Sequence, residues 1–150
     1  MKIAIASDHG GFELKEVLKA FLTSQSVDVM DLGPPDEESV DYPDFGIQVS
    51  DRVSRGEVER GILVCGTGIG MSVVANKFPR VRAALVHDLY SAKLSREHND
   101  ANILVLGGRI VGKDLAKEVV RVWLNTPFAG GRHQKRLDKI AALERERFKR

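Results

Sequence analysis

The chain of 150 residues has little of what marks several specialised classes of protein. Its one cysteine, Cys65, cannot form an internal disulfide, which favours a reducing compartment. No apolar run approaches the roughly 20 residues that a membrane-spanning helix needs. The N-terminal run is closed by Asp8 and is too short for a signal peptide. We therefore expect a cytoplasmic protein without a membrane partner.

An excess of charge of one sign is also missing. The chain carries 23 Lys and Arg residues against 21 Asp and Glu residues, and a net charge of +2 gives no support to a nucleic-acid partner. The 4 histidines lack zinc-binding spacing and there is no second cysteine, so we expect no metal site. With 43% hydrophobic residues and no internal linker, residues 1–150 are expected to form a single domain.

Short apolar runs alternate with amphipathic stretches along the chain. Nearly unbroken apolar runs are typical of parallel strands covered on both faces, and here they are Lys2–Ser7, Val27–Leu32, Gly61–Cys65, Val81–Val86 and Ile103–Leu106. The stretches with a helical period are 14–22, Pro43–Arg55, Ile69–Lys77, Leu89–His98 and Lys113–Asn125. The alternation predicts an α/β fold, a Rossmann-like three-layer α/β/α sandwich around a five-stranded parallel sheet.

A last amphipathic stretch follows Gly130-Gly131 and has no strand after it. It carries Leu137, Ile140, Ala141 and Phe148 among charged residues, which predicts a C-terminal helix. A terminal helix of this kind packs either on its own domain or on another subunit, and the sequence leaves both open.

Polar residues gather where the predicted strands end. Asp8 and His9 follow the first strand, Cys65 ends the third, Asp88 follows the fourth and Arg109 follows the fifth. Ligands of open parallel sheets bind outside the carboxyl ends of the strands. The sequence therefore indicates a binding site at this edge of the sheet.

The run Cys65-Gly66-Thr67-Gly68-Ile69-Gly70 is rich in glycine and precedes a predicted helix. Its backbone N–H groups could approach an anion closely, although a tight turn that binds nothing is the ordinary alternative. A Walker A loop does not fit, because Met71 stands near the place where that motif requires Lys. A phosphatase loop does not fit either, because Met71 also stands six residues after Cys65, where that loop requires Arg. The interpretation as a dinucleotide-binding loop is weakened because the third glycine, Gly70, comes one position early. It stays open because Asp88 lies about where a ribose-binding acid would follow.

Cys65 distinguishes this loop. Free cysteines usually act as small buried hydrophobes, yet a thiolate at a strand end and helix entrance would be stabilised by backbone dipoles. Such a thiolate could act as a nucleophile or as a base, and neighbouring amides could stabilise an oxyanion beside it. Both roles remain open at this point.

Histidine and arginine side chains supply further candidates. A neutral His9 or His98 could move protons on a sugar oxygen, whereas His87 has the features of a structural histidine. Arg132 and Arg136 are four residues apart, so both guanidinium groups share one helix face. They form either a solvated charged face or a phosphate clamp.

Six motifs in this order resemble the type B ribose-5-phosphate isomerases across nearly the whole chain. They are Ser7-Asp8-His9-Gly10-Gly11, Asp41-Tyr42-Pro43, Cys65-Gly66-Thr67-Gly68-Ile69-Gly70, Ala75-Asn76-Lys77, Ser95-Arg96-Glu97-His98-Asn99-Asp100-Ala101-Asn102 and Gly130-Gly131-Arg132-His133. The resemblance implies interconversion of D-ribose 5-phosphate and D-ribulose 5-phosphate through a cis-enediolate, without a cofactor.

The resemblance also implies roles for individual residues. Cys65 would take the proton from C2 and return it at C1, and His98 would donate a proton for ring opening with Asp8 nearby. The backbone amides of Gly66-Thr67-Gly68-Ile69-Gly70 would form the anion hole, with Thr67 relaying protons between the two oxygens. The phosphate would be held by His9, Arg109, Arg132 and Arg136, and the sugar would be contacted by Tyr42 and Asn99.

The family resemblance further implies a homodimer or tetramer with its sites at the subunit interface. It leaves the length of the substrate open, because relatives act on allose 6-phosphate or galactose 6-phosphate. A non-catalytic module that binds a nucleotide or sugar phosphate is the alternative from a different class.

Overall fold

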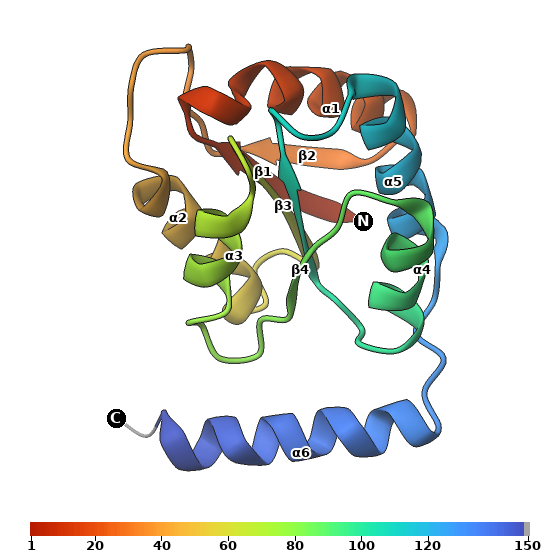
Figure 1. The fold of residues 1–150 in the computed structure, drawn as a ribbon. Coiled ribbons are helices and arrows are strands. Elements are labelled where there is room, and N and C mark those ends of the chain that lie inside the picture. Colours follow the sequence, from red (N-terminus) through yellow and green to blue (C-terminus); the bar gives the residue numbers. More distant parts are fainter. Residues whose placement is uncertain (149–150) are drawn as a thin grey trace.

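A single sheet organises the computed structural model, which describes residues 1–148 (Figure 1). The strands are β1 (Lys2–Ser7), β2 (Asp28–Asp31), β3 (Arg60–Cys65), β4 (Ala83–Leu85) and β5 (Ile103–Gly107). Their order is β2-β1-β3-β5-β4, and every neighbouring pair is parallel. The predicted five-stranded parallel sheet is therefore confirmed.

Helices cover both faces of this sheet. They are α1 (Phe12–Ser24), which follows the short turn η1 (His9–Gly11), α2 (Tyr42–Ser54), α3 (Ile69–Ala75), α4 (Leu89–Glu97), α5 (Lys113–Asn125) and α6 (Arg132–Arg147). One buried cluster joins the sheet to α1, α4 and α5, and the other joins its opposite face to α2 and α3. This confirms the three-layer α/β/α sandwich.

The fourth strand is shorter than its apolar run suggests. The prediction covered Val81–Val86, but only Ala83–Leu85 pair with β5. The backbone N–H of Arg82 donates instead to the side-chain oxygen of Asn102, at 2.8 Å. The Asn102 side chain thus takes the place of a backbone hydrogen-bond partner just before this edge strand begins.

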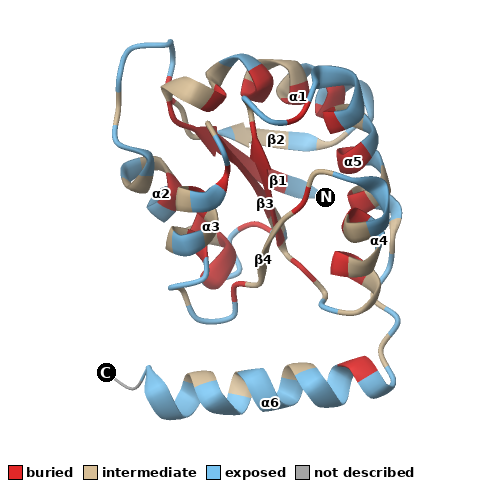
Figure 2. Cartoon of the chain, viewed as in Figure 1, coloured by how far each residue is buried: buried red, intermediate tan, exposed pale blue. Residues whose placement is uncertain are grey.

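Helix α6 lies apart from the two helical layers (Figure 1). His133 is its one buried residue within 132–147, and exposed positions cover most of the rest (Figure 2). Ile140 and Leu143 are both 53% exposed. Together with Val81 and Ala83 of the body, they line a cavity of about 470 Å³. The apolar face of the C-terminal helix is therefore left largely uncovered by its own chain.

None of the helices among residues 1–148 has the length and apolar character needed to cross a lipid bilayer.

An ion pair with one buried partner, Lys15, ties α1 to the end of β2. Lys15 is fully buried, and its ammonium group donates to both carboxylate oxygens of Asp31, at 3.0 and 3.1 Å, and to the carbonyl of Pro34, at 3.0 Å. Burial alone would raise the pKa of Asp31, but hydrogen bonds from Lys19, Gly33 and Lys15 outweigh it and hold the pKa below its ordinary value of 3.8. The ionised carboxylate is therefore favoured in the folded protein.

Asp31→Asn is expected to lower the free energy of unfolding at pH 7 by about 3 kcal/mol, because it leaves the Lys15 charge buried without its main partner. A carboxylate with a lowered pKa contributes stability above its ordinary pKa and loses it as the pH falls through the lowered one. The difference in the free energy of unfolding between the wild type and the variant should therefore become smaller below about pH 4. Urea unfolding across this range measures it, with Asp28→Asn on the exposed start of β2 as control. A constant gap would contradict the assignment.

Candidate active site

The carboxyl ends of β1, β3 and β5 lie side by side and bring together residues that are far apart in the sequence. Ser7 pairs with Val64, and Cys65 pairs with Gly107. Backbone hydrogen bonds extend the ladder beyond the strands, with Gly108 N–H donating to the Cys65 carbonyl at 2.8 Å and Arg109 N–H to the Gly66 carbonyl at 3.0 Å. The site predicted at this edge is thus anchored by the sheet itself.

The Cys65 side chain is 5% exposed and lies under its glycine-rich loop. Its Sγ accepts the backbone N–H of Gly68 at 3.2 Å. Gly68 has φ of +81°, and a Cβ there would lie 2.5 Å from the Leu85 side chain, so only glycine fits. The loop therefore directs a backbone N–H dipole at the sulfur.

Asp8 and His9 are each oriented by a backbone group. Asp8 is 9% exposed, and its Oδ1 accepts the N–H of Gly11 at 3.0 Å. The Nδ1 of His9 accepts the N–H of Val40 at 3.2 Å. Since Nδ1 accepts, a neutral His9 carries its proton on Nε2 and can donate it to a ligand.

Arg109 and Tyr42 close over the same loop. A Cβ on Gly66 would lie 3.2 Å from Nη1 of Arg109, and one on Gly70 would lie 2.6 Å from the Tyr42 ring. Arg109 and His9 also line a cavity of about 430 Å³. We call this set the carboxyl-edge group, which comprises Asp8, His9, Tyr42, Cys65, Gly66, Thr67, Gly68, Ile69, Gly70 and Arg109.

The other predicted residues form a second set, the amino-edge group, which comprises His98, Asn99, Arg132 and Arg136. His98 ends α4, and Asn102, a few residues later, accepts the N–H of Gly61 at the start of β3, at 2.9 Å. Strand β3 separates that point from Cys65 by about 13 Å, at roughly 3.3 Å per residue. Figure 1 likewise shows α6 lying well away from the start of α3. One chain therefore divides the predicted site residues between opposite edges of the sheet.

Within the amino-edge group, α6 is joined to α4 by two histidines. The rings of His98 and His133 stack with centroids 4.1 Å apart and planes 15° apart. Burial lowers the pKa of His133, and the nearby His98, Arg132 and Arg136 lower it further against the opposing effect of Glu97. The uncharged form of the His133 ring is therefore favoured where it rests on His98, beside the two arginines.

Two alternatives from the sequence can be judged on this geometry. Asp88 caps α4 by accepting the N–H of Ser91 at 2.7 Å, and hydrogen bonds from Ser91 hold its pKa below the ordinary value. It thus has a structural role, which further weakens a nucleotide site. His87 accepts the N–H of Gly107 at 2.9 Å and is structural, as predicted. Residues 1–148 hold no cluster of His, Cys, Asp and Glu that could bind a metal ion.

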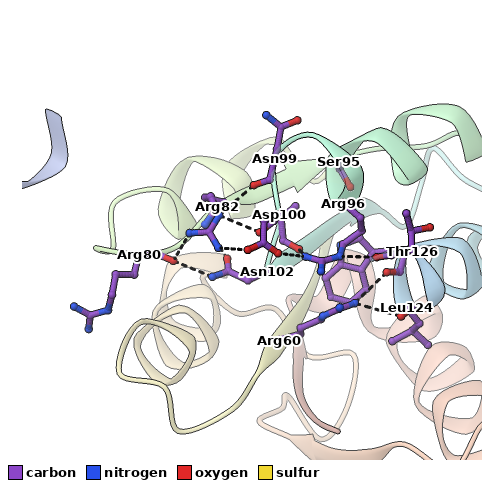
Figure 3. A network of polar contacts seen from close by, with 12 residues as sticks. Arg60, Arg80, Arg82, Ser95, Arg96, Asn99, Asp100, Asn102, Leu124 and Thr126 are labelled. Atoms are coloured by element: carbon purple, nitrogen blue, oxygen red, sulfur yellow. Dashed lines mark hydrogen bonds and ion pairs between the residues drawn. The ribbon is translucent and has the colours of Figure 1, made fainter. Parts of the chain in front are cut away.

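A polar network around the amino-edge group, shown in Figure 3, was not predicted from the sequence. Its core is Asp100, which is ion-paired with Arg96 at 2.8 Å and Arg82 at 3.4 Å. The spacing of four residues between Arg96 and Asp100 was a usable signal. The contributions of Arg82 and His133 arise from chain segments distant in sequence and carry no local signal.

The chain is similar to known ribose-5-phosphate isomerases over nearly its whole length. The chain is 49% identical over 146 residues to ribose-5-phosphate isomerase B of Escherichia coli, covering 97% of this chain and 98% of the relative. It superimposes on the structure of ribose-5-phosphate isomerase B from Clostridium thermocellum with a TM-score of 0.95 and 53% identity, covering 97% of this chain and 99% of the other. For the enzyme of Mycoplasma genitalium with bound ribulose-5-phosphate, the TM-score is 0.93 and the identity 43%, over 97% of both chains.

The match to the family described as ribose/galactose isomerase spans residues 3–140, which include both edge groups. On this evidence the chain belongs to the ribose/galactose isomerase family.

Proposed function

We propose that this protein is an aldose–ketose isomerase that interconverts D-ribose 5-phosphate and D-ribulose 5-phosphate. The observation that carries the proposal is the Cys65 thiol under a loop of backbone amides, with Asp8 and Arg109 on the adjacent strand ends. A base beside preorganised N–H donors is what proton removal next to a carbonyl requires. The relatives named for this reaction share the fold and about half of the sequence.

The reaction begins with ring opening. His98 donates a proton to the ring oxygen, and Asp8 accepts the proton of the C1 hydroxyl, which leaves an open-chain aldehyde. Asp8 then gives its proton to solvent and His98 takes one up, which restores both groups. Within residues 1–148, Asp8 uses Oδ1 in its hydrogen bond to Gly11, which leaves Oδ2 to accept this proton. His9 and Arg109 hold the phosphate together with Arg132 and Arg136.

Isomerisation then uses Cys65 twice. Its thiolate removes the proton from C2, and the resulting enediolate oxygen is stabilised by the backbone amides of Gly66–Gly70. Thr67 relays the proton from the C2 hydroxyl oxygen to the oxygen on C1, and Cys65 returns its own proton to C1. Every proton removed is returned, so the step needs neither a redox partner nor a cofactor.

We further propose that two copies build each site. The carboxyl-edge group needs a proton donor and a second phosphate clamp, which its own chain carries at the opposite edge. Ile69 and Val73, on the exposed side of α3, are 58% and 55% exposed, and α6 leaves its own apolar face uncovered. Two-fold symmetry would cover both surfaces and create two equivalent sites in a homodimer. A pair of dimers would give a tetramer.

The single cysteine supports a cytoplasmic location, since a thiol that must act as a base has to stay reduced. Residues 1–150 act as one domain in this proposal, because both edge groups depend on the same sheet. A substrate of six carbons, such as allose 6-phosphate or galactose 6-phosphate, would change only the spacing between Cys65 and the phosphate-binding arginines.

The proposal is tested by adding the protein to D-ribose 5-phosphate in the presence of EDTA. We expect D-ribulose 5-phosphate to form at a rate that the chelator does not change. Comparing kcat/KM with the two hexose phosphates decides the substrate length, and a strong preference for six carbons would replace the pentose assignment. Tight nucleotide binding without formation of any ketose would favour the non-catalytic module instead.

Gly70→Ala is expected to raise KM for ribose 5-phosphate several-fold while leaving the melting temperature nearly unchanged. The added methyl group would lie 2.6 Å from the exposed Tyr42 ring, which can swing away from the sugar at little cost. Gly112→Ala is the matched control, because nothing lies within 4 Å of a Cβ there. Steady-state kinetics of the two variants make the comparison. Equal KM values would remove Tyr42 from the binding site.

A further inference from the structure

The turn after α4 presents His98 and Asn99 and then reverses direction at Asp100. Asp100 has φ of +45°, in the left-handed region that few residues other than glycine adopt. A residue stays in this region only when its surroundings hold it there. The turn that carries the proposed proton donor therefore depends on contacts made by Asp100.

Two arginines supply those contacts from either side (Figure 3). The side chain of Arg96 is 6% exposed, and its Nη1 donates to Asp100 Oδ1 and to the Ala101 carbonyl, both at 2.8 Å. The Nε of Arg82 donates to the carbonyls of Asn99 and Asp100, at 3.1 and 3.0 Å, while its Nη2 reaches Asp100 Oδ2 at 3.4 Å. The carboxylate thus sits between two guanidinium groups that also bind the backbone of the turn.

The arrangement leaves the functional side chains of the turn free. Asn99 is held by its backbone carbonyl, and its side chain points away from Arg82 and the rest of the network (Figure 3). The ring of His98 rests on His133 at 4.1 Å. The arginine network therefore holds the backbone of the turn, and the ring of His133 holds the imidazole of His98.

The same network reaches the segment that leads to the phosphate-binding arginines. Arg96 Nε donates to the Thr126 carbonyl at 3.2 Å, and the N–H of Ala129 donates to the Glu97 carbonyl at 3.0 Å. The turn and the start of α6 are therefore attached to one rigid layer, which sets the spacing between His98 and Arg132.

We propose that Asp100 is a positioning residue for ring opening, holding His98 and Asn99 in place through Arg82 and Arg96. The inference rests on the proposed function, since it assumes that His98 is the proton donor. Misplacement of a proton donor by about 1 Å can cost on the order of 10²-fold in rate. A neutral asparagine keeps the shape of Asp100 but gives up the charge-assisted hydrogen bonds to both guanidinium groups.

The test isolates ring opening from isomerisation. In a Cys65→Ala background the protein cannot remove the C2 proton, yet His98 can still open the ring. Enzyme-catalysed exchange between the α and β anomers of ribose 5-phosphate, followed by NMR saturation transfer, then reports ring opening alone. We expect exchange above the rate in buffer with Cys65→Ala, and a loss of about 10- to 100-fold of that excess when Asp100→Asn is added. His98→Gln should cause at least the same loss.

Asp51→Asn is the matched control, because Asp51 and Arg55 form an ion pair with the same spacing and the same 2.8 Å distance on the surface of α2. It should leave the exchange unchanged. If Asp100→Asn fails to fold, Arg82→Gln provides the second variant, since it removes the contacts to the turn and keeps the pair between Arg96 and Asp100. A loss of exchange with Arg82→Gln in folded protein supports the proposal as well.

Exchange that persists at the Cys65→Ala rate in a folded Asp100 or Arg82 variant would overturn the proposal. Wild-type protein that isomerises, combined with a Cys65→Ala variant that never accelerates exchange, would also overturn it while leaving the isomerase assignment intact. Wild-type protein that forms no ribulose 5-phosphate would instead reject the proposed function.

Discussion

Cys65→Ala is expected to lower kcat for ribose 5-phosphate by about 10²- to 10⁴-fold, the usual contribution of general base catalysis. The variant loses the proposed base, which would move the proton between C2 and C1, but keeps Arg109, His9 and the loop amides. KM should therefore change much less than kcat. Stopped-time measurement of ribulose 5-phosphate formation, with product trapped as it forms, covers this range.

Cys65→Ser sharpens the prediction. Serine retains a side chain that can accept the Gly68 N–H, which lies 3.2 Å from the sulfur. Its hydroxyl is a far weaker acid than a thiol, so a serine should fold well and still lose most of the activity. An alanine or serine variant with near wild-type kcat would exclude Cys65 as the base.

Much of the fold could be predicted because buried parallel strands have a simple sequence pattern, a short and nearly continuous apolar run. Ile3–Ala6 and Ile62–Val64 are fully buried, each between two layers of helices, so their sequences are almost continuously apolar. The placement of Asp8, Cys65 and Arg109 followed from this, since the carboxyl ends of neighbouring parallel strands must meet. The ladder that continues from Cys65 to Gly108 shows how directly the sheet sets these positions.

The separation of His98, Arg132 and Arg136 from Cys65 could not be read from periodicity. The position of His98 depends on which edge of the sheet the end of α4 reaches. The positions of Arg132 and Arg136 depend on α6, whose apolar face is left largely uncovered by its own chain. The contacts of Asp100 were equally hidden, because Arg82 reaches it from the segment just before β4. A local pattern reports on neighbours in sequence, whereas Arg82 and Asp100 are 18 residues apart.

Mixing two inactive variants is expected to restore activity, because in the proposed homodimer both defects fall in the same one of the two sites. Cys65→Ala damages the carboxyl-edge group of one copy, and His98→Gln damages the amino-edge group of the other. If each site takes one group from each copy, a heterodimer has one doubly damaged site and one intact site. Its activity should be about half that of wild type, against almost none for either variant alone.

The decisive measurement is the activity of this heterodimer, made by co-expressing the two variants with different affinity tags and purifying through both. We expect about half of wild-type kcat per dimer, and the same result when Arg136→Ala replaces His98→Gln. A wild-type protein carrying both tags controls for the tags themselves. A purified heterodimer as inactive as the two single-variant proteins would show that each site is built within one chain. That result would contradict the proposal that two copies build each site.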